Sequence, residues 1–271
     1  MLVDTHCHVH ESTYPHAADQ VLQRATDAGV TTMICVGTDD KSSNEAYDFA
    51  IAHTGVYCSI GIHPHEVARN TNGGLAELNV HFLGSLISDK FTKGHASKLV
   101  AIGEIGLDYF YEHAPRDTQI KVLKEQIQLA LEYDLPIIFH VREAFDDFWP
   151  IFDSFNGTIK GVLHSFTDSA ENMRAAIARG LYIGVNGIST FTKDEAQKEM
   201  FASIPVNRLL LETDAPFLTP TPLRGKVNEP AFVRYVADHH ATIRGLSTDE
   251  LAARTTANAH ALFALSLNTN S

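Results

Sequence analysis

Residues 2–8 read Leu-Val-Asp-Thr-His-Cys-His, and this short stretch indicates both the fold and the chemistry of the chain. The apolar pair Leu2-Val3 is typical of the start of a buried β-strand, and His6 and His8 follow it two residues apart. Because strand side chains point alternately to the two faces, both imidazoles are expected on one side and Cys7 on the other. Two neutral imidazoles directed at one point form half of a transition-metal site.

The composition is that of a large chain with a single core. It has 271 residues, 44% of them hydrophobic and 20% charged. No linker or low-complexity tract divides it, so we predict one domain over residues 1–271. We find no secretory signal and no apolar run of the roughly 18 residues that cross a bilayer. We therefore expect a cytoplasmic protein without a membrane partner, whose odd number of cysteines (Cys7, Cys35 and Cys58) are buried free thiols.

The formal net charge of −12 argues against non-specific adhesion to nucleic acid or to an anionic membrane. It does not exclude a polyanionic substrate that is held at one cationic spot, because bound divalent ions are often the largest local charges in a site.

Short apolar runs alternate with amphipathic helical patterns along the chain. The predicted strands are Leu2–His8, Thr31–Gly37, Val56–His63, Leu99–Leu107, Pro136–Val141, Ile159–Phe166, Leu181–Val185 and Arg208–Thr213. The predicted helices between them are Ala17–Ala28, Ser43–His53, Ala76–Ile87, Pro115–Tyr133, Ala144–Phe155, Ser169–Ala178 and Lys193–Ser203, and two extra helices follow at Pro230–Ile243 and Thr248–Leu265. The alternation predicts an α/β fold, a (β/α)8 TIM barrel. An open doubly wound sheet is the alternative, although no Gly-rich nucleotide loop follows any strand.

Imidazole and carboxyl groups recur at the C-terminal ends of these strands, the face where barrel enzymes keep their chemistry. Six of them are candidate metal ligands: His6, His8, Glu104, His140, His164 and Asp214. Any one of them alone is more typical of a satisfied core residue. As a buried cluster they would be costly to desolvate, and a pair of divalent cations removes that cost by neutralising the carboxylates and accepting the imidazole lone pairs. The set therefore predicts a site for two divalent metal ions.

Two residues indicate the class of substrate. Many amidohydrolase barrels bridge their two ions with a carboxylated lysine at the end of the fourth strand, where this chain has Glu104. The nearest lysine, Lys98, opens that strand on the wrong side. Arg142 lies two residues after His140 and on the same face, where its guanidinium suits a phosphate. A structural salt bridge is the alternative role of Arg142.

Seven motifs of the chain closely resemble the TatD family of metal-dependent deoxyribonucleases, in the family's order and over nearly the whole length. They are Asp-Thr-His-Cys-His (4–8), Gly-Ile-His-Pro-His (61–65), Gly-Glu-Ile-Gly-Leu-Asp-Tyr (103–109), His-Val-Arg (140–142), His-Ser-Phe (164–166), Glu-Thr-Asp-Ala-Pro (212–216) and Asn-Glu-Pro (228–230). The resemblance implies a metal-dependent-hydrolase barrel that hydrolyses DNA phosphodiesters, generally as a 3′→5′ exonuclease.

The resemblance also implies a division of the ligands between the two ions. His6, His8, Glu104 and Asp214 would hold one ion, and Glu104 would be shared with a second ion that His140 and His164 complete. One departure is His10, which stands where the family usually has Asp or Asn.

For such an enzyme we expect a water activated by two metals as the nucleophile. Asp214 would orient the water and take its proton, Glu104 would bridge the ions, and Arg142 with His63 and His65 would bind the phosphate oxygens. Magnesium or manganese is expected in activity, while zinc, iron or nickel also suits imidazole ligands.

The expected partner is a DNA substrate, single-stranded or at its 3′ ends, and the sequence indicates no obligate protein partner. Two other readings stay open from the sequence. One is a metallohydrolase of a small ester, lactone or amide. The other is a non-enzymatic barrel with structural metals.

Overall fold

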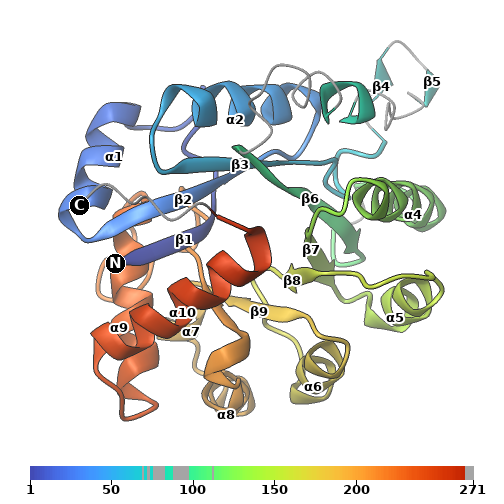
Figure 1. Cartoon of the computed structure of the whole chain (residues 1–271). Helices are drawn as coiled ribbons and strands as arrows, with labels where there is room; N and C mark the ends of the chain where they lie inside the picture. Colours follow the sequence, from blue (N-terminus) through green and yellow to red (C-terminus); the bar gives the residue numbers. More distant parts are fainter. Residues whose placement is uncertain (69, 72–73, 76–82, 88–97, 112, 266–271) are drawn as a thin grey trace.

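The computed structural model describes residues 1–68, 70–71, 74–75, 83–87, 98–111 and 113–265 (Figure 1). Eight strands form one sheet in the order β1-β2-β3-β6-β7-β8-β9-β10, and every neighbouring pair is parallel. Their bounds are β1 (Leu2–Cys7), β2 (Val30–Val36), β3 (Val56–Ile60), β6 (Leu99–Asp108), β7 (Ile137–Arg142), β8 (Gly161–Leu163), β9 (Tyr182–Val185) and β10 (Leu209–Leu211). A separate antiparallel pair consists of β4 (Asn70–Thr71) and β5 (Gly74–Leu75).

The sheet closes between its first and last strands, at the end where the metal ligands were predicted. The backbone N–H of Asp214 donates to the carbonyl of His6 over 2.8 Å, and the N–H of His8 donates to the carbonyl of Ala215 over 2.8 Å. These two bonds join β1 to the segment after β10. The predicted (β/α)8 barrel is thereby confirmed, and its closure holds three predicted ligands side by side.

Helices alternate with the strands and surround the sheet (Figure 1). They are α1 (Ala18–Asp27), α2 (Asp40–Ala52), α4 (Arg116–Glu132), α5 (Phe145–Asp153), α6 (Ala170–Ala178), α7 (Ile188–Phe191), α8 (Glu195–Ser203), α9 (Val233–Thr242) and α10 (Thr248–Phe263), with 3-10 turns η2 (Val206–Arg208) and η3 (Pro230–Phe232). Of the helix predicted over residues 76–87, residues 83–87 are helical and 76–82 lie outside the described residues.

Several helix ends follow from local sequence. The hydroxyl of Ser169 accepts a hydrogen bond from the N–H of Asn172 and so caps α6, as expected for a serine at this position. Gly29 and Gly180 follow α1 and α6 with φ of 81° and 85°, a left-handed conformation that glycine adopts without strain. Each glycine therefore turns the chain from a helix into the next strand.

The last helix, α10, covers the N-terminal end of the barrel and appears in red in Figure 1. The side chain of Asn258 donates to the carbonyls of Val206 and Leu209, which lie at the start of β10. Thr256 donates to the carbonyl of Met1, which precedes β1. Phe263 is buried in one cluster with apolar residues of the strands. Because α10 closes this end, the opposite, C-terminal end is the one left for a site.

The three cysteines lie in the main apolar cluster between the strands and the helices. All three are free and fully buried, as predicted. The Sγ of Cys7 lies 3.5 Å from the carbonyl of Ile34, on the side of β1 opposite to the two histidines. Among the described residues, Cys7 belongs to none of the groups of side chains that could hold a metal ion.

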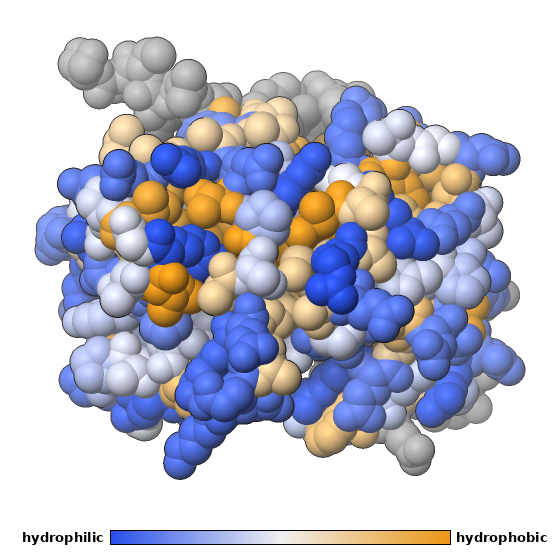
Figure 2. Space-filling model, turned by 90° about the horizontal axis from the view of Figure 1, so that it is seen from below, coloured by the Kyte–Doolittle hydropathy of each residue, from blue (hydrophilic) through white to orange (hydrophobic). Residues whose placement is uncertain are grey.

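The face of the molecule in Figure 2 is mainly polar. Figure 2 shows one face, on which hydrophilic residues surround a central group of apolar ones. Within the part of the chain that the structure describes, no helix is long and apolar enough to cross a membrane.

Candidate metal centre

Glu104 lies inside β6, between two glycines that let β6 approach β7 closely. A Cβ on Gly103 would lie 2.6 Å from the Cβ of Ile138, and a Cβ on Gly106 would collide with the carbonyl of His140. Any larger residue at either position would push the two strands apart. The Gly-Glu-Ile-Gly sequence thus brings the carboxylate of Glu104 within 2.7 Å of the Nδ1 of His140 on β7.

A first donor group is formed by His6, His8 and Asp214. The Nε2 atoms of His6 and His8 lie 3.2 Å apart. The Oδ1 of Asp214 lies 3.6 Å from the Nε2 of His6 and 3.4 Å from that of His8. The three ligand atoms lie within 4.8 Å of one another, close enough to share one ion. Asp214 has a φ of 59°, a strained conformation for a residue with a side chain, of the kind that collects at functional sites.

A second donor group is formed by Glu104, His140 and His63. The Nε2 of His63 lies 3.5 Å from the Oε1 of Glu104. His63 was predicted as the last residue of its strand, but β3 ends at Ile60 and His63 lies in the segment that follows. The sequence also suggested a contact with substrate rather than with the carboxylate of Glu104. Glu104 also reaches the first group, since its Oε2 lies 3.4 Å from the Nε2 of His6. Its two oxygens are therefore placed to serve both groups.

His164 lies between the two groups. Its Nε2 is 3.7 Å from the Oε1 of Glu104 and 3.9 Å from the Oδ1 of Asp214. Its ring stacks on that of His6 with the centroids 3.5 Å apart. Its Nδ1 lies 2.9 Å from the Oε1 of Glu212. All six predicted ligands thus converge at one end of the barrel.

The carboxylates give this cluster a strongly negative field. Burial alone would lower the pKa of His140, but its hydrogen bonds to Asp108 and Glu104 raise that pKa to about 9. Burial is likewise outweighed at His164, where the charges of Glu212 and Glu104 raise the pKa to about 10. Burial would raise the pKa of Glu104, yet the surrounding imidazoles hold it well below its ordinary value. Ionised carboxylates therefore attract positive charge to this point.

The donor set fits divalent cations. It combines buried imidazole nitrogens with ionised carboxylate oxygens, which is the ligand chemistry of zinc, manganese and iron. A buried carboxylate pair is stable only with compensating positive charge, which here comes from protonated imidazoles or from cations. The buried Nδ1 of His6 has no hydrogen-bond partner among the described residues, as is expected of a polar atom in a site that is completed by a bound group.

Asp108, at the end of β6, is a residue whose role the sequence reasoning missed. Its Oδ2 accepts hydrogen bonds from the Nε2 of His140 over 3.0 Å and from the Nε2 of His65 over 2.9 Å. Its Oδ1 accepts the N–H groups of Phe110 and Tyr111, each over 3.0 Å. Asp108 thereby fixes the orientation of His140. The sequence feature that could have identified Asp108 is its position as an acidic residue directly after a predicted strand.

Glu212 and His10 were likewise not assigned a ligand role from sequence. Glu212 is buried beside His164 and accepts the N–H of Ser165 over 2.6 Å, so it holds the turn that follows β8. His10 is buried, and neither of its ring nitrogens has a hydrogen-bond partner among the described residues. Burial lowers the pKa of His10 to about 3, so its ring is neutral.

Arg142 and His65, the other predicted substrate contacts, lie beside the second donor group. Arg142 ends β7 and is paired with Asp108 in the sheet register. Its guanidinium carbon lies 3.9 Å from the centroid of the Phe110 ring and 4.8 Å from that of Tyr111. Among the described residues its guanidinium is in no ion pair, so the alternative role in a structural salt bridge is not observed.

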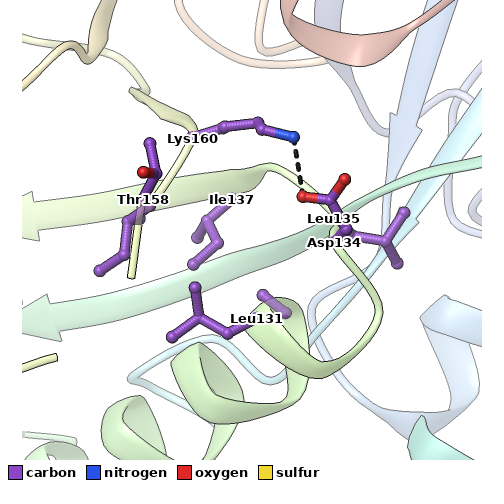
Figure 3. Close-up of a pocket in the computed structure, with 8 residues that line it drawn as sticks. Leu131, Asp134, Leu135, Ile137, Thr158 and Lys160 are labelled. Carbon is purple, nitrogen blue, oxygen red and sulfur yellow. Dashed lines mark hydrogen bonds and ion pairs between the residues drawn. The ribbon is translucent and has the colours of Figure 1, made fainter. Parts of the chain in front are cut away.

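Two features lie at the opposite, N-terminal end of the barrel. Lys98 donates to the carbonyls of His53 and Val56, each over 2.9 Å, and so lies away from Glu104, as predicted. The pocket in Figure 3 lies where β7 and β8 begin, beside the 2.7 Å ion pair of Lys160 and Asp134. Its volume of about 10 Å³ is room for about one water molecule.

Comparison with known proteins agrees with this geometry. The family model described as TatD related DNase matches residues 3–264. A metal-dependent hydrolase of Bacillus subtilis, itself uncharacterised, is 38% identical over 97% of this chain and 99% of its own length. A protein of Erwinia amylovora named 3′-5′ ssDNA/RNA exonuclease TatD is 35% identical over 91% of this chain and 93% of its own.

A solved structure shows the same fold. The crystal structure of a TatD homologue from Escherichia coli superposes with a TM-score of 0.88 at 29% identity, and the match covers 98% of each chain. The motifs, the fold and both sequence comparisons agree. The chain therefore belongs to the TatD family of metal-dependent hydrolases, within the group described as TatD related DNases.

Proposed function

We propose that this enzyme cleaves phosphodiester bonds of DNA with two divalent cations, as a 3′→5′ exonuclease on single strands. The observation that carries the proposal is the convergence of six imidazole and carboxyl groups on one rim. The guanidinium of Arg142, which forms no ion pair with the described residues, lies on the neighbouring strand position to Asp108. The relative from Erwinia amylovora, named as a 3′-5′ exonuclease of single-stranded DNA and RNA, supports the substrate class.

His6, His8 and Asp214 would hold one ion, and Glu104 with His140 and His164 would hold the other. His63 is a candidate for the second group as well, since its Nε2 lies 3.5 Å from Glu104. When bound, such cations polarise a phosphoryl oxygen and make a water molecule more acidic. Magnesium or manganese is the proposed pair in activity, although imidazole-rich ligation also suits zinc, iron or nickel.

The other steps fall to side chains of the chain itself. Asp214 would orient the attacking water and take its proton. Burial would raise the pKa of this carboxyl, but its hydrogen bond with His8 and the neighbouring imidazoles keep the pKa low, so the carboxylate holds a proton only briefly. Arg142 would donate to the non-bridging phosphate oxygens, since ring contacts use none of its N–H groups. His63 and His65 would bind the same phosphate.

Release of nucleotides from a labelled oligonucleotide tests the proposal. The metal-loaded enzyme should release labelled mononucleotides at once from a 3′-labelled single strand, and should shorten a 5′-labelled strand progressively. The rate of release from RNA of the same sequence, compared with the rate from DNA, shows whether the enzyme prefers DNA. Replacing His140 with Ala should abolish release, whereas His53→Ala should not, because His53 ends α2 at the far end of the barrel. Undiminished release by the His140 variant would contradict the ligand assignment, and no release by the wild-type protein would contradict the function.

A further inference from the structure

Two exposed aromatic side chains lie beside the candidate metal centre. Phe110 and Tyr111 lie two and three residues after the end of β6 at Asp108, with 48% and 42% of their surfaces exposed. Their rings are T-shaped to each other, with centroids 4.7 Å apart. The guanidinium of Arg142 lies over both rings, at 3.9 Å and 4.8 Å. We call Phe110, Tyr111 and Arg142 the aromatic shelf.

The shelf is joined rigidly to the centre. Asp108 accepts the N–H groups of Phe110 and Tyr111 with one carboxylate oxygen and the Nε2 of His140 with the other. Asp108 is almost fully buried, so this link has little freedom. The Tyr111 ring is also 5.4 Å from that of His65. A ligand on the shelf would therefore have a defined position relative to a phosphate at the centre.

The chemistry of the shelf matches one nucleotide. Exposed aromatic rings offer a flat apolar surface on which a base can stack whatever its sequence. The N–H groups of Arg142, which form no hydrogen bond or ion pair with the described residues, suit an anionic phosphate oxygen. A small ester or amide substrate has no use for the combination of a cation and two exposed rings.

We propose that the aromatic shelf stacks an unpaired nucleobase of the strand whose phosphate lies at the metal centre. The inference rests on the proposed function and adds a reason for single-strand preference. A base within a duplex already stacks on its neighbours and pairs with its partner, so it reaches the shelf only after it has been pulled out. An unpaired or frayed end meets no such barrier.

The test compares a strand with bases and a strand without them. The double variant Phe110→Leu/Tyr111→Leu keeps apolar side chains but removes both rings. Substrates are a single-stranded oligonucleotide and the same strand with abasic nucleotides at its last three positions. We expect the wild-type enzyme to prefer the base-bearing strand, and the ratio of the two kcat/KM values to fall at least about fivefold in the variant, which is the lower end for loss of one stacked base.

A matched control comes from the other end of the barrel. Tyr182 begins β9 and lies under Arg208, with the guanidinium carbon 5.2 Å from the ring centroid. Tyr182→Leu removes a ring from a similar arginine–aromatic pair and should leave the substrate ratio unchanged. Thermal unfolding followed by circular dichroism checks that all variants are folded.

A binding measurement without catalysis separates the two proposals. In the presence of a chelator, an oligonucleotide that ends in 2-aminopurine should lose fluorescence on binding to the wild-type protein, because stacking quenches this base, and should keep it with the double variant. Two results would contradict base stacking on the aromatic shelf without affecting the proposed nuclease activity. One is equal quenching by the wild-type protein and the double variant. The other is cleavage of both strands with the same ratio of kcat/KM values in the wild-type enzyme and the variant. Quenching without cleavage of either strand supports the shelf and overturns the nuclease.

Discussion

At the scale of single residues, the proposed metal ligands are held by neighbouring side chains that have no ligand role of their own. His140 has both ring nitrogens engaged, Nδ1 by Glu104 and Nε2 by Asp108. The Nδ1 of His164 lies 2.9 Å from the Oε1 of Glu212, close enough for an ion pair. Groups that orient a ligating histidine contribute strongly to metal affinity, because they fix its tautomer and its direction.

Replacing Asp108 with Asn should lower metal affinity or activity by about 10- to 100-fold, the usual cost of losing such a partner. An amide has one oxygen and one NH2 group, so it cannot accept both from the two histidines and from the N–H groups of Phe110 and Tyr111, as the carboxylate does. Titration of the metal-free variant with Mn²⁺, followed by nuclease activity, gives both quantities. Asp134→Asn is the control, since Asp134 pairs with Lys160 at the far end of the barrel. Equal metal affinity and activity of the two variants would show that Asp108 does not support the metal centre.

At this scale the sequence pointed to the residues that converge at the centre, but not to the residues that hold them in place. The six candidates were visible because each is a histidine or carboxylate at the end of a predicted strand. Asp108 and Glu212 lie in the same motifs, yet their contacts depend on which strands become neighbours in space. The proximity of His63 to Glu104 could not be predicted either, because it depends on the close approach of the backbone at Gly61 to that at Gly103.

At the scale of helices and strands, all eight barrel strands were predicted, while several ends were not. The strand expected over Ile159–Phe166 is β8, Gly161–Leu163, and the one expected over Arg208–Thr213 is β10, Leu209–Leu211. Both stop before a residue with positive φ, Ser165 at 49° and Asp214 at 59°, which periodicity cannot reveal. Helix α7 was missed because four residues are too few for a helical pattern.

The contact between α9 and α7 makes stability depend on pH. His240 is fully buried, with its Nδ1 2.8 Å from the Nη1 of Arg244 and its Nε2 2.9 Å from the Oγ of Ser189. Because arginine only donates, the Nδ1 must accept, so the ring is neutral and Nε2 donates to Ser189. Burial and the charge of Arg244 lower the pKa of His240 well below its ordinary 6.5.

A histidine with a lowered pKa in the folded state stabilises the fold least in acid. Above about pH 6.5 both states are neutral at this ring. Below about pH 6.5 this histidine binds a proton in the unfolded chain but stays neutral in the folded protein. The free energy of unfolding therefore falls by up to about 1.4 kcal/mol per pH unit. Urea unfolding between pH 5 and 7 with a chelator should show a steeper pH dependence for the wild-type protein than for His240→Gln. Parallel curves would contradict this assignment.

At the scale of the whole molecule, the acidic charge sets how the enzyme meets its substrate. With a formal net charge of −12, long-range attraction to a polyanion is absent, and binding must come from the centre and its rim. The family, the barrel and the hydrolase class were all predicted from the sequence and are confirmed. They could be predicted because the motifs span the chain and the strand–helix alternation is regular.

A local binding site predicts a weak dependence on salt. For single strands each neutralised phosphate contributes a slope of about 0.7 in log affinity against log salt, so a rise from about 50 to 200 mM costs roughly threefold per contact. With Arg142 and few other cationic contacts, we expect the KM for a single strand to rise about 3- to 20-fold over this range, one to three contacts. A loss of about a thousandfold would indicate an extended cationic track instead.

The metal content of the protein shows directly whether two cations bind at this rim. The protein, stripped with a chelator and dialysed against excess Mn²⁺ or Zn²⁺, should hold two ions per chain by mass spectrometry. His6→Ala/His8→Ala and His140→Ala should each lose at least one, and His53→Ala should retain both. Protein that takes up no metal, or variants that bind as much as the wild-type chain, would contradict a two-cation centre at this rim.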